Sequence, residues 1–122
     1  MIYLSKEEKA EMCAKLTQHL PKLRKLLNLT QEDLARVSGL SRVTISQIEG
    51  GKVKMNWLHL NAILFICNAN IRTKEYLYTN DVLGKRFARF AELKEEDEEP
   101  EINVNIDVNL LSKYKPLIKY LH

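Results

Sequence analysis

The residue types that most often catalyse reactions or bind metals are scattered along this sequence. His19, His59 and His122 stand alone, and no motif typical of a zinc protease, a serine hydrolase or a phosphate-binding loop occurs. Cys13 and Cys67 lie far apart, and neither has a second Cys nearby, which argues against a disulfide framework and against a zinc site. We therefore expect two reduced core thiols, no metal, no cofactor and no enzymatic activity.

The charged residues are divided unevenly along the chain. The net charge of the 122 residues is +3, but residues 1–91 hold 15 Lys and Arg against 8 Asp and Glu, whereas residues 92–122 hold 4 against 8. A basic body of this kind indicates a polyanionic partner. We interpret the acidic run 92–101 as a solvated helix end and linker, and the alternative is an acidic arm that competes with the polyanion for the basic face.

The overall composition is that of one ordinary globular domain. Hydrophobic residues make up 45% of the chain and charged residues 29%, with only four glycines and three prolines. The longest apolar run, residues 62–67, is far shorter than the ~18–20 residues that a membrane span requires, and the pattern of a signal peptide is missing. We expect a cytoplasmic protein without a membrane partner.

Two signals define the first expected helix. Ser5 followed by Glu8 fits a capping box, and a stripe of apolar residues at helical spacing comes after it. The stripe passes through Pro21, which lacks an amide proton and crowds the carbonyl four residues back, so we expect one bent helix or two stacked helices. The inward residues are Met12, Leu16, Leu20, Leu23 and Leu27.

Two short helices are expected next. Thr30, with Asp33 three residues on, caps the second helix, and Gly39 ends it. Ser41 caps the third, which ends at the pair Gly50 and Gly51. The inner side of the second helix is Leu34, Ala35 and Val37, and that of the third is Ile45 and Ile48.

Three further helices are expected before the acidic run. Asn56 caps the fourth, Thr73 caps a single-turn fifth, and the sixth starts between Thr79 and Asp81 and continues into the acidic residues. Residues 1–78 thus form one helical domain and residues 79–122 a C-terminal extension. The stripe of the sixth helix is Leu83, Phe87, Phe90 and Ala91.

Residues 102–110 alternate strictly between apolar and polar types, which predicts a lone half-buried strand. A single strand cannot satisfy its own backbone groups, so we expect it to pair with the same strand of a second copy. The alternative is an extended tail whose apolar side lies over the helical body.

The spacing within residues 31–50 meets the requirements of a helix-turn-helix. Ala35 supplies the small residue that two closely crossing helices need, and Gly39 supplies the positive φ of the tight turn four residues later. Apolar residues at fixed offsets then hold both helices against the core: Leu34, Leu40, Ile45 and Ile48.

This region resembles the lambda-repressor/Cro-like (Xre-type) helix-turn-helix family between about Leu20 and Tyr78. The most typical stretches are 29–35 (LTQEDLA), 38–41 (SGLS) and 44–52 (TISQIEGGK). One departure is Ser38, where many members carry a larger apolar residue. The resemblance implies an all-α fold: a lambda-repressor-like five-helix DNA-binding domain, here with a C-terminal helix and a lone β-strand extension.

The resemblance also implies the roles of individual residues, because the family places its third helix in the DNA major groove. Arg42 is the first candidate to read a base, since a guanidinium can donate two hydrogen bonds to guanine. The alternative is that Arg42 only contacts a phosphate. The implied base contacts are Arg42, Val43, Ser46 and Gln47, and the implied phosphate contacts are Gln31, Ser41, Thr44, Lys52 and Lys54. A structural ion pair is implied between Arg24 and Glu49.

The function that the resemblance implies is sequence-specific transcription regulation of the repressing kind, by a homodimer on an inverted repeat of double-stranded DNA. Two alternatives remain: an antitoxin-type autoregulator whose C-terminal tail binds a protein partner, and a protein-interaction adaptor without DNA binding. The expected dimer contacts are Leu83, Phe87, Phe90, Ile102, Val104, Ile106 and Val108.

Overall fold

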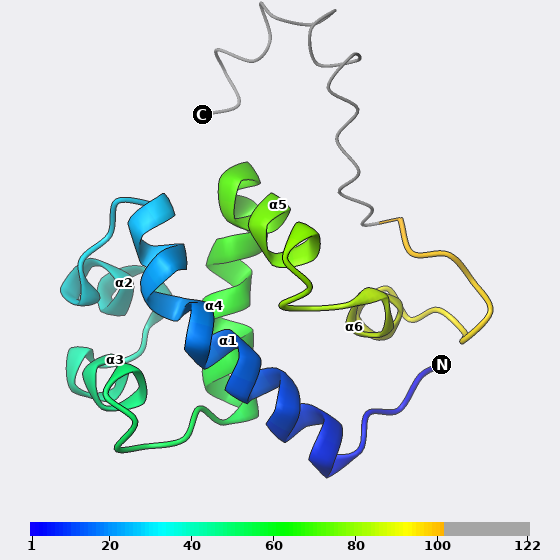
Figure 1. The fold of residues 1–122 in the computed structure, drawn as a ribbon, viewed down its shortest axis with the longest axis horizontal. Helices are drawn as coiled ribbons and strands as arrows, with labels where there is room; N and C mark the ends of the chain where they lie inside the picture. The colour runs from blue at the N-terminus through cyan, green and yellow to red at the C-terminus, as the bar shows by residue number, and fades with distance from the viewer. Residues whose placement is uncertain (102–122) are drawn as a thin grey trace, which may run out of the picture.

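The computed structural model describes residues 1–101, and in this part of the chain it contains helices and no strand (Figure 1). The all-helical class is therefore confirmed for residues 1–101. The strand expected over residues 102–110 lies outside the described residues, as do Ile102, Val104, Ile106 and Val108. The helices are α1 (Lys6–Leu26), α2 (Gln31–Ser38), α3 (Arg42–Glu49), α4 (Trp57–Ala69), α5 (Ile71–Thr79) and α6 (Lys85–Ala91).

The first four helices begin at the residues that the sequence predicts. The side chains of Ser5, Thr30, Ser41 and Asn56 each accept a hydrogen bond from the backbone amide three residues later. These bonds satisfy amides of the first turn that have no partner within the helix. Local hydrogen bonding of this kind depends only on neighbouring residues, which is why the sequence alone reveals it.

Helix α1 continues through Pro21 as one helix, so the alternative of two stacked helices is wrong. The proline removes one backbone hydrogen bond, which costs about 3 kcal/mol in a helix interior. Leu16, Leu20 and Leu23 are fully buried on both sides of it. Because each buried leucine contributes about 1.5–3 kcal/mol, their packing outweighs the lost bond.

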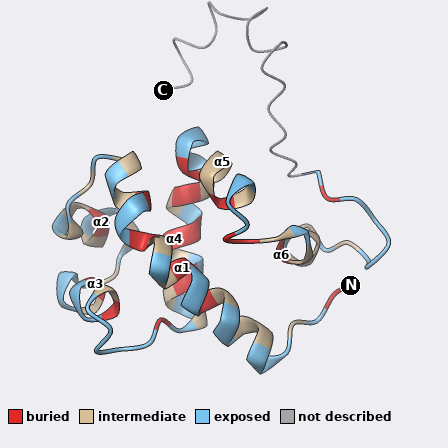
Figure 2. Cartoon of the chain, viewed as in Figure 1, coloured by how far each residue is buried: buried red, intermediate tan, exposed pale blue. Residues whose placement is uncertain are grey.

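The core forms where α1, α4 and α5 meet, with α2 and α3 packed at one side (Figure 2). Leu34 of α2 and both inner isoleucines of α3, Ile45 and Ile48, are buried in it. Val37 was expected inside but is half exposed, and Leu34 is the single buried side chain of this two-turn helix.

Thr73 does not cap α5, contrary to expectation, because α5 already starts at Ile71. The buried Thr73 hydroxyl instead donates hydrogen bonds to the backbone carbonyls of Cys67 (2.7 Å) and Asn70 (3.1 Å). Carbonyls in the last turn of a helix lack partners within it. Thr73 thus caps the end of α4.

The sixth helix starts later and ends earlier than predicted. Helix α5 extends through Thr79, the chain then turns through Asp81 at a positive φ of 52°, and α6 begins only at Lys85. It stops at Ala91, with Leu93 at a φ of 60°, so it does not run into the acidic residues. Asp tolerates the left-handed region better than most residues, which makes Asp81 a natural place for the break.

The hydrophobic core continues past the domain boundary expected after residue 78. Val82, Leu83, Phe87 and Ala88 are buried within the chain, and the rings of Phe87 and Phe90 pack against Trp57 with centroids 6.1–6.3 Å apart. Leu83 and Phe87, expected in a dimer contact, are only 1% and 4% exposed, so they have no surface to offer a second copy.

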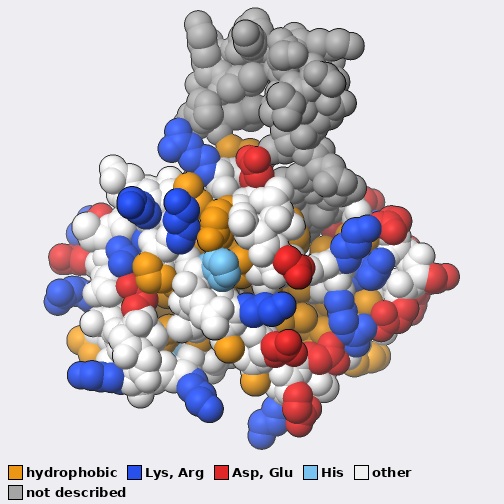
Figure 3. Space-filling model, in the orientation of Figure 1, with side chains coloured by type: hydrophobic (Ala, Val, Ile, Leu, Met, Phe, Trp, Pro, Cys, Tyr) orange, Lys and Arg blue, Asp and Glu red, His pale blue; other side chains and the backbone are white. Residues whose placement is uncertain are grey.

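The acidic segment 92–101 lies against α6 and the N-terminus. Arg86 pairs with Glu8 and Glu96, and the Arg89 side chain donates to the backbone carbonyl of Glu98 (2.7 Å). Figure 3 shows acidic side chains gathered on this side of the molecule, at the right of the view. In the described residues, then, the acidic segment neutralises the basic side chains of α6 and does not cover α3.

If residues 79–91 belong to the core, Leu83→Ala will destabilise the protein by about 2–5 kcal/mol, the usual cost of a large cavity. Leu93→Ala is the matched control, because Leu93 is exposed and should change the free energy of unfolding by less than about 0.5 kcal/mol. Urea denaturation measures both. Equal, small effects would show that this segment is not part of the core.

Candidate nucleic-acid interface

The turn between α2 and α3 has the geometry that a helix-turn-helix requires. Gly39 adopts a φ of 80°, and its amide donates to the Ala35 carbonyl at 3.0 Å. Ser38, the departure from the family pattern, accepts a hydrogen bond from the Leu40 amide (3.3 Å). The serine thus contributes to the turn through its hydroxyl.

Helix α3 divides into a buried and an exposed side. Ile45 and Ile48 are fully buried, which fixes the rotation of the helix about its own axis. The four residues expected to read bases are all exposed and follow helical spacing on the outer side: Arg42, Val43, Ser46 and Gln47. The fold therefore brings this set together on one solvent-facing surface.

The residues expected at phosphates lie around this surface. Ser41 caps α3, and its hydroxyl also lies 2.7 Å from that of Thr44. Lys52 and Lys54 are exposed in the loop after α3, and neither forms an ion pair with any residue in the range 1–101. The Gln31 side chain is partly engaged, because its Nε2 donates to Glu49 Oε1 at 2.9 Å.

The Glu49 carboxylate joins three helices. It accepts hydrogen bonds from Arg24 Nε (2.7 Å) and Nη2 (2.9 Å) on α1, in addition to the bond from Gln31 on α2. The remaining guanidinium nitrogen, Arg24 Nη1, donates to the Leu29 carbonyl at 3.1 Å. The Arg24 and Glu49 side chains are 20% and 8% exposed, so the ion pair implied by the resemblance is present and largely shielded from water.

The electrostatics of Glu49 reflect this arrangement. Burial by itself raises the pKa of the Glu49 carboxyl, but the hydrogen bonds from Arg24 and Gln31 outweigh burial and hold the pKa below its usual range. The hydrogen bond to Glu49 correspondingly raises the pKa of Arg24. Both groups therefore stay charged at neutral pH.

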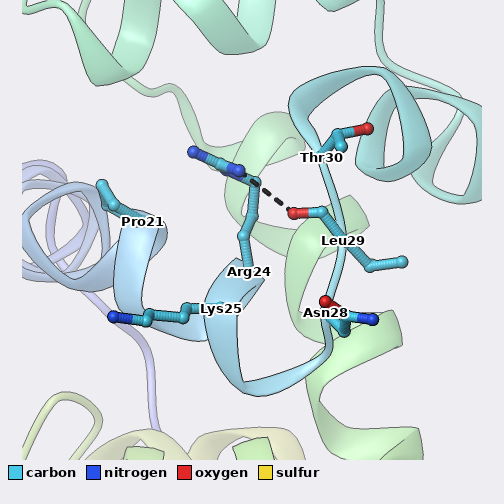
Figure 4. A pocket seen from close by; sticks show the side chains of 6 residues that line it. All are labelled: Pro21, Arg24, Lys25, Asn28, Leu29 and Thr30. Carbon is cyan, nitrogen blue, oxygen red and sulfur yellow. Dashed lines mark hydrogen bonds between the residues drawn. The ribbon is translucent and has the colours of Figure 1, made fainter.

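A depression of about 370 Å³ adjoins this cluster, between the end of α1 and the start of α2 (Figure 4). Its lining includes Arg24, Asn28 and Thr30, and in Figure 4 the Arg24 guanidinium reaches across to the Leu29 carbonyl. Sequence analysis did not find this hollow. Because all three guanidinium nitrogens already donate within the chain and the charge is paired with Glu49, Arg24 supports the local fold here.

The histidines and cysteines have structural surroundings. His19 Nδ1 lies 2.7 Å from the Tyr76 hydroxyl, and His59 Nδ1 accepts a hydrogen bond from the backbone amide of Asn56. Cys13 and Cys67 are free and buried, and burial raises the pKa of the Cys67 thiol to about 12. Within residues 1–101, no group of three or more metal-ligating side chains is assembled, and no helix is long and apolar enough to cross a membrane.

We expect strong coupling between Arg24 and Glu49 in a double-mutant cycle. Arg24→Leu alone leaves the shielded Glu49 charge without its partner and should cost about 3 kcal/mol of unfolding free energy. The double variant Arg24→Leu/Glu49→Leu should be clearly more stable than Arg24→Leu, because no charge is left unpaired. Chemical denaturation of the four proteins gives the coupling energy, and a value near zero would contradict this account.

The lowered pKa of Glu49 also predicts an acid dependence of stability. Its contribution is fully present above the pKa of the unfolded carboxyl, about 4.3, and is lost as the pH falls through the lower folded pKa. Between pH 5 and 3, the unfolding free energy of Glu49→Gln should therefore fall less steeply than that of the wild type.

Asp33 provides the internal reference for this pH series. The backbone hydrogen bond from Thr30 lowers its pKa in both proteins, so part of the acid dependence persists in the variant. Urea denaturation at several pH values measures the two slopes. Equal slopes would mean that Glu49 does not contribute.

A helix-turn-helix family model matches residues 22–54, which span the end of α1, all of α2 and α3, and the loop that carries Lys52 and Lys54. No curated protein and no solved structure matches the chain. The matched segment contains Arg24, Gln31 and Glu49, the three residues that lock the helices together, and the exposed side of α3. Residues 22–54 of this chain thus match the helix-turn-helix of the Xre/lambda-repressor-like type, which is typical of DNA-binding transcription regulators.

Proposed function

We propose that the chain is a repressor that binds an inverted-repeat operator as a homodimer, with α3 in the major groove of each half-site. The observation that carries the proposal is the exposed side of α3, which presents Arg42, Val43, Ser46 and Gln47 to solvent while Ile45 and Ile48 anchor the opposite side. An α-helix of this kind fits the major groove, where each base pair presents a distinct pattern of hydrogen-bonding groups.

The chemistry of the exposed side suits base recognition. Arg42, at the first position of α3, can donate two parallel hydrogen bonds to O6 and N7 of a guanine. Val43 is 63% exposed and offers an apolar contact to a thymine methyl group. Ser46 and Gln47 lie one turn further on, where their short polar groups reach base edges directly or through water.

The surroundings of α3 suit phosphate binding. Lys52 and Lys54 carry positive charges that no acidic side chain of residues 1–101 pairs with, next to the C-terminal end of α3, and Thr44 and Ser41 present hydroxyl groups near its start. Gln31 retains a second amide hydrogen beyond the one that it donates to Glu49. Contacts of this type fix the register of the protein on DNA and make affinity fall as salt rises.

Two copies are needed to read an inverted repeat. The recognition helices of such dimers enter successive major grooves roughly 34–36 Å apart. We propose that the alternating segment, residues 102–110, contributes to the dimer by pairing with its counterpart in the second copy. Phe90 is partly buried against the core, so any part it plays in the dimer is limited to the remaining exposed edge of its ring.

Selection of duplexes from a random DNA pool at physiological salt tests the proposal. Wild-type protein should enrich an inverted repeat whose half-site centres lie about one helical turn apart. Arg42→Ala should lose the preference at one position of each half-site, at a cost of about 1–3 kcal/mol for the preferred base. Arg72→Ala is the matched control, because Arg72 is exposed on α5 and should leave the selected sequence unchanged.

A second variant separates base recognition from phosphate binding. Lys52→Ala should weaken binding to all sequences about equally and reduce the slope of log affinity against log salt by about 1. Absence of any enriched sequence for the wild type, together with an affinity that does not change with salt, would reject DNA recognition and favour a protein-binding function.

A further inference from the structure

Helix α4 has an apolar outer face that no other part of the described chain covers. Leu58 and Phe65 are 78% and 76% exposed, although they are among the largest apolar side chains of the helix. They are seven residues apart, two helical turns, and therefore lie on the same side. We define the outer face of α4 as Leu58, Asn61, Phe65 and Ala69, all of which are exposed.

The opposite side of α4 is the one that packs in the core. Leu60, Ile63, Leu64 and Cys67 are buried there, and α4 contacts α1, α2 and α5. A surface helix normally carries charged residues opposite its buried stripe. Helix α4 carries none from Trp57 to Ala69, although 29% of the residues in the chain are charged.

The absence of charge points to a particular kind of partner. In a contact about a twofold axis, the same surface patch of both copies meets its equivalent. A net charge on that patch therefore faces a like charge on the second copy and opposes association. A charge-free face meets its own copy without this repulsion. A basic or acidic partner, by contrast, would find no complementary charge on this face.

We propose that the outer face of α4 is a homodimer contact, in which α4 packs against α4 of a second copy across a twofold axis. The proposal deepens the proposed function and rests on its dimeric part. It also supplies a dimer contact in place of the one expected at Leu83 and Phe87, because both of these side chains are buried in the core.

Asn61 gives this contact a defined register. It lies between Leu58 and Phe65, and its Nδ2 donates to the Trp57 carbonyl at 2.7 Å, which holds the side chain along the helix. Its Oδ1 accepts no hydrogen bond from residues 1–101 and can accept one from the Asn61 carboxamide of a second copy. A polar Asn in the middle of a helix pair selects one register, because any shift leaves the amide without a partner.

The size of the face predicts a weak dimer. A fully buried aromatic side chain covers ~150–250 Å², so Phe65 and Leu58 together offer on the order of 300 Å² per protomer. A stable interface needs about 800 Å² from each partner. Association through α4 should therefore be reversible in solution and become strong when two copies sit on adjacent half-sites of one DNA.

Sedimentation equilibrium of the full chain without DNA, over a range of concentrations, tests the contact directly. The wild type should show a reversible monomer–dimer equilibrium, and Leu58→Ala/Phe65→Ala should weaken it at least tenfold. Alanine favours helix, so the variant keeps α4 intact. Tyr3→Ala is the control: Tyr3 is as exposed as these residues but lies outside α4, and its loss should leave the dimer constant unchanged.

Asn61→Asp tests the twofold symmetry. Asn61 is exposed, so the change should have little effect on folding of the monomer, but it places two negative charges opposite each other and should weaken dimerisation at least tenfold. Asn61→Cys should form a disulfide-linked dimer under mild oxidation, whereas Tyr3→Cys should not. The native Cys13 and Cys67 do not interfere, because both are buried.

The outcomes separate this inference from the proposed function. A wild type that stays monomeric at every concentration, or α4 variants that dimerise like the wild type, would overturn the α4 contact even if DNA selection succeeds. Failure of DNA selection alongside a dimer that is lost in the α4 variants would overturn the proposed function and leave the contact in place.

Discussion

The position of α3 depends on one carboxylate. Glu49, the last residue of α3, is held by Arg24 of α1 and by Gln31 of α2, so a single acidic group ties together the three helices of the DNA-binding segment. Helix α3 packs mainly on α1 and α2. The cluster of Arg24, Gln31 and Glu49 therefore fixes the orientation of α3 and of its exposed residues. Because the Arg24–Glu49 pair is shielded from water, a rearrangement that separates the two charges is costly.

The cluster of Arg24, Gln31 and Glu49 in turn depends on the packing of α1. Arg24 lies on the same helix as Pro21 and reaches Glu49 only because α1 continues past the proline. Burial of Leu20 and Leu23 on either side of Pro21 keeps the helix intact at that point. Core packing thus keeps α1 helical at Pro21, where local sequence rules predict a break. The orientation of α3 depends on this, because it lets Arg24 reach Glu49.

Features governed by neighbouring residues could be predicted from the sequence, whereas most features governed by distant contacts could not. The exception is the Arg24–Glu49 ion pair, which the family resemblance implied. The caps at Ser5 and Thr30, and the left-handed turn at Gly39, follow from residues within four positions of each other. The exposed side of α3 likewise follows from the helical spacing of its two isoleucines. Leu83 was assigned to a dimer surface, because an apolar stripe does not reveal whether its partner is the same chain or another copy. The Gln31–Glu49 hydrogen bond was missed because the two residues are far apart in sequence.

The most direct test of the central claim is a map of the DNA-contacting surface on the protein. Backbone amide signals of isotope-labelled protein, followed by NMR during titration with the selected duplex, should shift most in α3, at the start of α2 and in the loop carrying Lys52 and Lys54. Signals of α6 should change little. Large shifts confined to α4 or α6, with α3 unaffected, would contradict the account.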